Sequence, residues 1–283
     1  MLNGCAYILT VDVGNTFIRF GLFAEDSAAA QERPLATCEI TTPSSITADE
    51  ARMRLAQVMA ALAADAGMPG ALVPTAAVLS CVVPALERPW KTALSRTCTG
   101  RVLTVGPGLK TGMPVHYDNP AEIGPDRIAD AVAARAVYGS PCIVIDLGTT
   151  TNIEVIDARG TFVGGVIAPG LALGARSLSA AAARLPQVEP SAPTHVIGRN
   201  TREAMRSGVV LGEVARIDGM LDMVLAEMRA TKAAGEGDVP IVITGDDAEA
   251  LASLVGHSLT VDDTLTLRGL AELYRINQKP RRV

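Results

Sequence analysis

The chain has 283 residues, of which 48% are hydrophobic and 19% are charged, and its net charge is -5. This composition excludes a disordered chain, and the acidic balance without a long basic stripe argues against a nucleic-acid partner. No apolar run is long enough for a membrane helix, and the first residues lack the basic region and cleavage site of a signal peptide. We therefore expect a cytoplasmic protein without a membrane partner.

The first elements form a predicted hairpin. Residues 7–12 are an apolar run that ends on Asp12, residues 13–16 have turn chemistry, and residues 17–23 resume as a strand. A polar bend that contains a glycine joins the two strands.

Helices and strands then alternate. A helix is predicted at 48–66, where Thr47 and Glu50 have the spacing of a capping box. Residues 78–83 are a candidate buried strand, and a helix is expected after Pro84. This alternation indicates an α/β fold.

A loop separates the two predicted lobes. A short strand at 101–105 leads into the segment 107–120, which is rich in Gly, Pro and polar residues. We place the boundary there, between an N-terminal lobe of residues 1–118 and a C-terminal lobe of residues 119–283. Pro125 then suits the first position of a helix.

The opening pattern recurs in the second lobe. An apolar strand ends on Asp146, a turn of the form Asp-x-Gly-polar-Thr follows, and a strand resumes at 153–156. Asp12 and Asp146 are 134 positions apart (146 − 12). The repeat predicts two related lobes that face each other; the alternative is two unrelated hairpins, because such turns are common. The remaining predicted elements are a strand at 162–170, helices at 171–184 and 201–230, a strand at 241–245 and a helix near 267–274.

Both turns suit phosphate chemistry. The bend after Asp12 offers backbone N–H groups with Asn15 and Thr16 as further donors, and Asp12 can hold magnesium through water. Alternatively, the Asp12 and Asn15 side chains only form hydrogen bonds with the backbone of their own turn. In the second loop the hydroxyls of Thr149 to Thr151 can contact phosphate, or they simply begin a polar strand.

A third group of residues opens the predicted helix at Pro125. The helix N-terminus favours anions, so we expect it to keep Asp126 ionised and to lower its basicity while it orients a substrate hydroxyl. Arg127 can pair with a substrate carboxylate. Alternatively, Asp126 only stabilises the helix and Arg127 lies on a solvated face.

Taken in order, seven segments resemble the type III pantothenate kinases, a branch of the acetate and sugar kinase, Hsp70 and actin superfamily. The matching segments are 12–16 with Gly21, 80–84, 117–120, 124–127, 146–149, 164–170 and 197–201. The resemblance implies two related actin-like, ribonuclease H-like lobes, with mixed sheets flanked by helices and a nucleotide cleft between them. It also implies ATP-dependent phosphorylation of pantothenate to 4'-phosphopantothenate, the first step of coenzyme A biosynthesis.

The resemblance assigns roles to residues by position. Asp126 corresponds to the catalytic base, and Asp146 to the ligand of a monovalent cation, K⁺ or NH₄⁺. Mg²⁺ accompanies the ATP, and family members are homodimers. The implied ATP and phosphate contacts are Asp12, Val13, Gly14, Asn15, Thr16, Phe17, Ile18, Arg19 and Thr149. The implied substrate contacts are Tyr117, Gly124, Pro125, Asp126 and Arg127, with Thr201 supplied by the other subunit.

Four positions depart from the family pattern. Pro125 stands where alanine is usual, and Phe17 stands where a polar residue is common. Asn152 stands where the second phosphate loop of the family has threonine. Asp246 stands where the family has a second glycine after Gly245, in a turn expected beside the adenosine. These changes keep two alternatives open: a non-catalytic relative that binds or regulates, and a related kinase with another small substrate.

Overall fold

A computed structural model describes residues 6–25, 30–68 and 72–278. Contacts divide the chain into two compact units: unit 1 comprises residues 1–137 and 264–283, and unit 2 comprises residues 138–263. The sequence placed the lobe boundary between 118 and 119. The contacts instead place the division after residue 137 and assign the last helix, α8 (Leu265–Ile276), to unit 1. This helix packs on the first sheet and approaches α3 (Pro125–Tyr138) closely.

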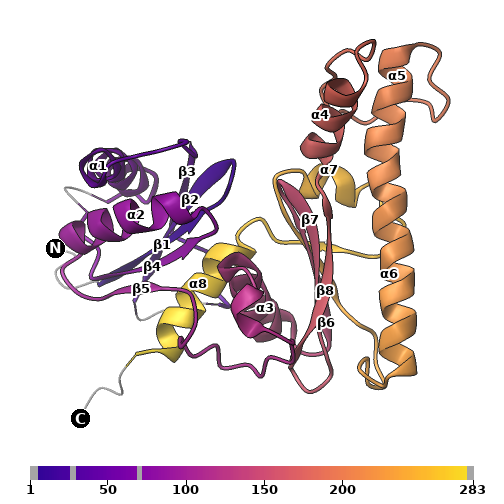
Figure 1. Cartoon of the computed structure of the whole chain (residues 1–283). Helices are drawn as coiled ribbons and strands as arrows, with labels where there is room; N and C mark the ends of the chain where they lie inside the picture. The colour runs from indigo at the N-terminus through magenta and orange to yellow at the C-terminus, as the bar shows by residue number, and fades with distance from the viewer. Residues whose placement is uncertain (1–5, 26–29, 69–71, 279–283) are drawn as a thin grey trace. The chain divides into compact units, whose positions relative to one another are not determined.

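Unit 1 is built on a five-stranded mixed sheet of order β3-β2-β1-β4-β5 (Figure 1). Its strands are β1 (Tyr7–Val13), β2 (Phe17–Ala24), β3 (Ala36–Thr41), β4 (Ala76–Cys81) and β5 (Val102–Thr104). β1, β2 and β3 pair antiparallel, whereas β4 and β5 run parallel to β1. The hairpin predicted at the start of the chain is confirmed.

Helices α1 (Ala48–Asp65) and α2 (Pro84–Thr97) cover one face of this sheet. The predicted capping box begins α1, since the Glu50 N–H donates to Thr47 Oγ1 at 3.2 Å and the Thr47 N–H donates to Glu50 Oε2 at 2.8 Å. The apolar face of α1 is buried in the core, where the Phe20 and Trp90 rings lie 5.6 Å apart. A short 3-10 turn, η1 (Pro120–Glu122), precedes α3.

Unit 2 repeats the same sheet topology. Read from β8, its order is β8-β7-β6-β9-β10, with β6, β7 and β8 antiparallel and β9 and β10 parallel to β6. The strands are β6 (Cys142–Leu147), β7 (Thr150–Ile156), β8 (Phe162–Pro169), β9 (Ile241–Gly245) and β10 (Thr260–Val261). Asp12 pairs with Arg19 and Ser80 in the first sheet, and Asp146 pairs with Asn152 and Thr244 in the second. The internal repeat read from the sequence is therefore confirmed by two mixed sheets with equivalent strands.

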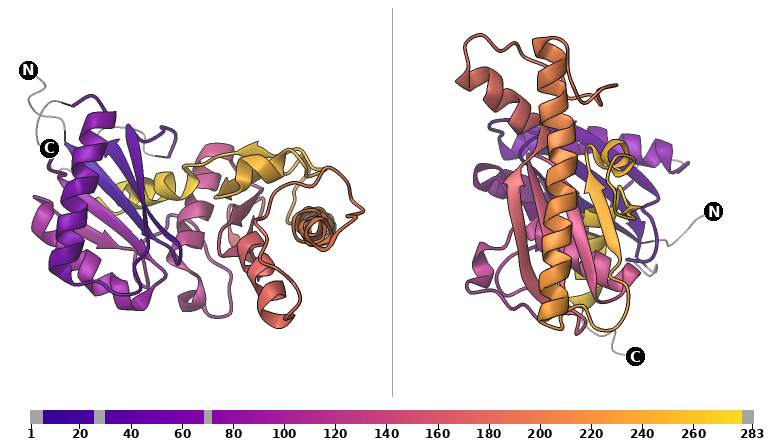
Figure 2. Two further views of the ribbon diagram at one scale, coloured as in Figure 1. Left: turned by 90° about the horizontal axis from the view of Figure 1, so that it is seen from above. Right: turned by 90° about the vertical axis from the view of Figure 1, so that its right-hand side faces the viewer.

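The helices of unit 2 are α4 (Leu171–Ala181), α5 (Thr201–Arg206), α6 (Gly212–Ala230) and α7 (Ala248–Ala252). A π-helical segment, η2 (Ser207–Leu211), joins α5 to α6, so the predicted helix at 201–230 is continuous but irregular. Figure 2 shows α6 running along one face of the sheet, where Ile217 and Leu221 pack against strand residues such as Ile145.

The sequence did not indicate β3, β10, η1 or α7. β3 is an edge strand with alternating exposed side chains, and β10 has two residues, so neither presents an apolar run. None of the described helices is long and apolar enough to cross a membrane.

Candidate active site

The turn between β1 and β2 is tight and tied to a neighbouring segment. The Gly14 N–H donates to Phe17 O at 3.0 Å, and the Thr42 hydroxyl donates to Gly14 O at 2.7 Å. A Cβ at Gly14 would lie 3.0 Å from Phe17 O, which leaves little space for a side chain. Asn15 and Thr16 are exposed at the tip, so the turn offers donors to solvent.

The other residues predicted to contact phosphate lie along this hairpin. The Val13 and Ile18 side chains are fully buried, so only their backbone groups can face a ligand. Arg19 pairs with Glu39 at 3.0 Å, and its guanidinium carbon lies 6.0 Å from the centre of the half-buried Phe17 ring. The ion pair with Glu39 holds the guanidinium group of Arg19 next to the turn.

Asp12 is a buried acid at the carboxyl end of β1, with 7% of its surface exposed. Its Oδ1 atom is buried and has no hydrogen-bond partner among the described residues. Burial and, to a smaller extent, the charge of Asp126 raise the pKa of Asp12 to about 6, while Ser80 and Arg19 act in the opposite direction. A buried carboxylate oxygen without a partner suits a hard cation or its water shell.

Asp126 lies in the first turn of α3. The Arg127 backbone N–H donates to its Oδ1 at 2.8 Å, and a Cβ at Gly124 would lie 2.3 Å from the same oxygen. Glycine at 124 therefore makes room for the carboxylate. Burial raises the pKa of Asp126, although the Arg127 N–H and the Arg127 charge oppose this. The expected lowering of its basicity was wrong, because the loss of hydration outweighs the helix N-terminus.

Arg127 is buried, with 5% of its surface exposed, so it does not lie on a solvated face. Tyr117 is half-buried in the loop that precedes η1. In that loop Asn119 Oδ1 accepts from the Ala121 N–H at 3.3 Å and so begins the turn. Gly124, Asp126 and Arg127 are brought together at the helix start, as the sequence predicted.

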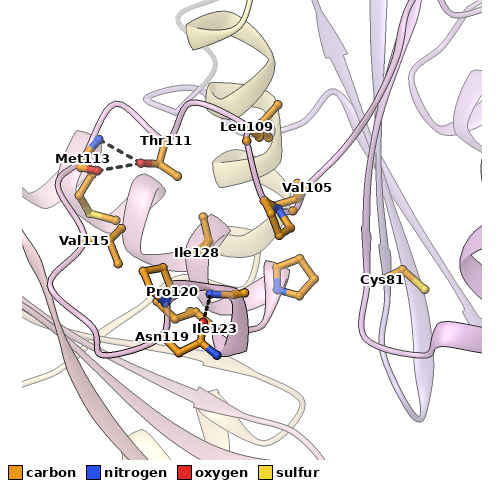
Figure 3. Close-up of a pocket in the computed structure, with 15 residues that line it drawn as sticks. Cys81, Val105, Leu109, Thr111, Met113, Val115, Asn119, Pro120, Ile123 and Ile128 are labelled. Atoms are coloured by element: carbon orange, nitrogen blue, oxygen red, sulfur yellow. Dashed lines mark hydrogen bonds between the residues drawn. The ribbon is translucent and has the colours of Figure 1, made fainter.

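A mostly apolar pocket of about 650 Å³ lies under this loop in unit 1 (Figure 3). Pro125 lines it, whereas Tyr117, Gly124, Asp126 and Arg127 are not among its lining residues. Burial raises the pKa of the Cys81 thiol, at one side of the pocket, to about 11, so this thiol is neutral at physiological pH. The other apolar walls are Val105, Leu109, Met113, Val115, Ile123 and Ile128.

Unit 2 carries the second turn. The Gly148 N–H donates to Thr150 O and the Gly170 N–H donates to Thr149 O, both at 3.0 Å. A Cβ at Gly170 would lie 2.2 Å from Gly148 O, so the segment after β8 can approach the turn only as glycine. Thr149 is half-buried in this turn, and Asp146 is half-buried at the end of β6.

Thr151 does not share the position of Thr149. It is 3% exposed, and its hydroxyl donates to Glu213 Oε1 at 2.6 Å. Glu213 also pairs with Arg216. For Thr151 the alternative reading, a polar strand start, is correct. Asn152 is buried beside Asp146 in the sheet rather than exposed in the loop.

Gly245, at the end of β9, has a φ of +100°, and a Cβ there would lie 2.0 Å from Leu147 O. Only glycine is compatible with this close approach. Asp246 is exposed. Its φ is not positive, because Lys232 is the one non-glycine residue with positive φ among the described residues. Asp246 therefore needs no glycine conformation, and its departure from the family pattern changes charge and not backbone strain.

Thr201 is exposed at the first position of α5. The preceding Asn200 side chain accepts from the Glu203 N–H at 3.0 Å, and a Cβ at Gly198 would lie 2.2 Å from the Ala204 nitrogen. The segment 198–203 is thus a close-packed helix start.

Ser80 has no role predicted from the sequence. This residue is fully buried, the parallel register places it beside Asp12, and its hydroxyl acts to lower the pKa of that carboxyl. The sequence feature that could have indicated Ser80 is a polar residue within the apolar run 78–83. Only the pairing of β4 with β1 connects this residue with Asp12.

The oxygen donors of this site fit magnesium better than a transition metal. Within the described part of the chain, no three His, Cys, Asp or Glu side chains are arranged to hold a metal ion. A site of one carboxylate and water suits Mg²⁺, which keeps much of its hydration shell and shares phosphate oxygens. The Asp12 Oδ1 atom meets this requirement.

Comparison with known proteins gives a consistent picture. A family model described as type III pantothenate kinase matches residues 8–223. A type III pantothenate kinase of Koribacter versatilis (strain Ellin345) is 38% identical, over 96% of both chains. One from Nocardia farcinica (strain IFM 10152) is 41% identical, over 97% of this chain and 99% of the relative.

Among solved structures, a Campylobacter jejuni protein described as a conserved Baf family transcriptional activator is similar in fold. Its TM-score is 0.57 at 18% identity, over 95% of this chain and 98% of that one. At this identity the likeness extends to the fold alone.

Proposed function

The chain belongs to the type III pantothenate kinase family, and we propose that it transfers the γ-phosphoryl group of ATP to the primary hydroxyl of pantothenate. The product is 4'-phosphopantothenate, and the reaction is the first step of coenzyme A biosynthesis. Asp126 carries the proposal, because a half-buried carboxyl of raised pKa beside a buried arginine suits proton transfer from a substrate that bears a carboxylate.

Asp126 acts as the general base. The pantothenate hydroxyl gives its proton to Asp126 as its oxygen bonds to the γ-phosphorus, and the bond from this phosphorus to the bridging oxygen of ADP breaks. A raised pKa makes Asp126 a stronger proton acceptor than an exposed aspartate. The Arg127 N–H, at 2.8 Å from Oδ1, holds the carboxylate in place.

The substrate contacts are assigned around this base. The Arg127 guanidinium binds the pantothenate carboxylate, since a planar, permanently charged group can accept it in a bidentate way. Tyr117, Gly124 and Pro125 complete the set on the same unit, and Thr201 is contributed by a second subunit.

The two turns hold the phosphates of ATP. In the first, residues 13–16 offer backbone N–H groups with the exposed Asn15 and Thr16 side chains, and Arg19 adds charge. Thr149 is the contact from the second turn. Asp12 is the residue that would hold Mg²⁺, and this ion would supply charge neutralisation at the phosphates. Asp146 is the ligand of a monovalent cation, K⁺ or NH₄⁺.

Exposed apolar side chains support a homodimer. Val196 and Ile197, which directly precede the helix start of Thr201, are 73% and 83% exposed. Large apolar residues with this exposure are typical of a surface that a partner covers. We place the working enzyme in the cytoplasm, where ATP and reduced thiols occur together.

The test is a coupled ADP-release assay with the purified chain, ATP, magnesium and pantothenate, in potassium or sodium chloride. Pantothenate-dependent ADP release in potassium alone would support both the reaction and the role of Asp146. Release in both salts would keep the kinase and remove the cation assignment.

Two outcomes favour the alternatives. Folded protein that binds pantothenate or ATP without releasing ADP in either salt would indicate a non-catalytic relative. ADP release with another small hydroxy acid but not with pantothenate would indicate a kinase of different specificity.

A further inference from the structure

A second pocket, of about 450 Å³, lies wholly within unit 2 and has a positively charged lining. It is open to solvent and is lined by α4, the segment 187–189 and α5, which Figure 1 shows near one end of α6. Three arginines line it, Arg176 from α4 and Arg202 and Arg206 from α5, together with one acid, Glu189. The charges of these four side chains sum to +2 (three positive, one negative).

Direct ion pairs within the protein do not offset the charge of these arginines. None of the three guanidinium groups forms an ion pair with any residue in the described ranges, and Glu189 forms none either. Arg202 Nη1 donates to the backbone oxygen of Gln187 at 3.2 Å, which fixes this side chain across the pocket. Three cations that line one pocket repel each other and favour a bound anion.

Arg206 provides an independent observation. Its Nε atom is buried and has no acceptor among the described residues. Its nearest acid along the helix is Glu203, whose pKa is lowered chiefly because its carboxylate accepts the Arg199 N–H, with a smaller contribution from the Arg206 charge. A buried guanidinium N–H that lacks an acceptor is costly unless a ligand supplies one.

We infer that this pocket binds a phosphate group, either free or on a small organic ester. A phosphate dianion matches the +2 charge of the lining and brings several acceptor oxygens, which guanidinium groups recognise in a bidentate way. The volume lies in the range of small-molecule sites, so it also leaves room for part of an ester. The site shares no residue with the catalytic machinery proposed above, and it stands independently of the kinase reaction.

Calorimetric titration of inorganic phosphate into the full chain in chloride buffer tests the inference. Arg206→Gln and Arg176→Gln should each weaken phosphate binding by roughly tenfold or more, since each removes charged hydrogen bonds. Arg229→Gln, which changes an exposed arginine of α6 outside the pocket, is the matched control and should bind like the wild type. Phosphate binding to the nucleotide turns is common to all these proteins and cancels in the comparison.

Equal phosphate affinity in the wild type, Arg206→Gln and Arg176→Gln would overturn the inference, as would chloride that competes as well as phosphate. If circular dichroism shows that Arg206→Gln does not fold, the exposed Arg176 decides the result. A parallel titration with ethyl phosphate distinguishes the sources. Tighter binding of the ester indicates an organic phosphate, and equal binding indicates free phosphate.

Discussion

Asp12, which is buried, and Asp126, which is half-buried, are two acids of unit 1 with different proposed roles. Burial raises the pKa of both, and the charge of Asp126 adds to the shift of Asp12. For a proton acceptor the raised pKa is useful, because it increases basicity near neutral pH. For a residue that holds magnesium through water it is a cost, because the ionised form is poorly solvated until the cation arrives.

This cost predicts that Asp12→Asn stabilises the metal-free protein at neutral pH. The folded-state pKa of about 6 lies above the ordinary value of 3.8, so the carboxyl is neutral and harmless below about pH 4. Stability is lost as pH rises through 6, because the folded protein must then ionise a buried acid. The shift corresponds to at most about 3 kcal/mol.

Thermal melting of both proteins without magnesium provides the measurement. We expect the Asn variant to melt higher than the wild type at pH 7.5, with the difference shrinking toward zero at pH 4. Equal melting temperatures at pH 7.5 would show that Asp12 is not strained by burial.

Asp126→Asn should separate proton transfer from binding. Asparagine keeps the size of the side chain and an oxygen that can accept the Arg127 N–H, but it cannot accept the substrate proton. We expect turnover to fall by on the order of a hundredfold or more, with pantothenate affinity little changed. Single-turnover kinetics and calorimetry measure the two quantities, and near-normal turnover would remove Asp126 as the base.

At the scale of the element, glycines decide how closely the loops approach each other. Gly170 allows the end of β8 to reach the β6–β7 turn, and Gly245 allows the end of β9 to pass Leu147 O at a distance that no Cβ could tolerate. The backbone of the second phosphate loop is thus held by two glycines, whereas Asp246 adds only a charged side chain.

Asp246→Gly should therefore tighten ATP binding without altering the fold. Removing an exposed negative charge from the turn proposed beside the nucleotide is worth up to about 1 kcal/mol, or roughly a fivefold lower KM for ATP. Steady-state kinetics with ATP as the varied substrate checks this. Asp238→Gly, in the exposed segment before the other end of β9, is the control and should leave the KM unchanged. A KM that falls equally in both variants would contradict a local effect of Asp246.

At the scale of the whole molecule, two sheets with one topology carry equivalent acids at the ends of β1 and β6. Unit 2 adds the exposed pair Val196 and Ile197 before α5, which the proposed dimer would cover. The role assigned to Thr201 depends on that partner.

We expect Ile197→Asp to weaken the dimer and to lower activity together. A charge placed in an apolar interface loses its hydration without gaining a partner. Light scattering after gel filtration gives the mass, and the ADP-release assay gives activity. Met53→Asp, at an exposed site of α1 in unit 1, is the control and should change neither. A monomeric wild type of full activity would remove the dimer and the role of Thr201.

Local structure and the membership of the candidate site could be predicted from the sequence alone. The structure contains each local feature that depends on neighbouring residues. These are the two hairpins whose first strands carry Asp12 and Asp146, the capping box of α1 and the helix that begins at Pro125. The motifs also brought Gly124, Asp126 and Arg127 together, because they lie in a single helix start.

Tertiary structure alone decided the properties that depend on distant residues. The edge strand β3 has no apolar run and exists because β2 pairs with it. Ser80 stands beside Asp12 only through the pairing of β4 with β1, and α8 joins unit 1 although it ends the chain. The raised pKa of Asp126 follows from burial, which local sequence does not specify, because desolvation is the sum of contacts from the whole fold.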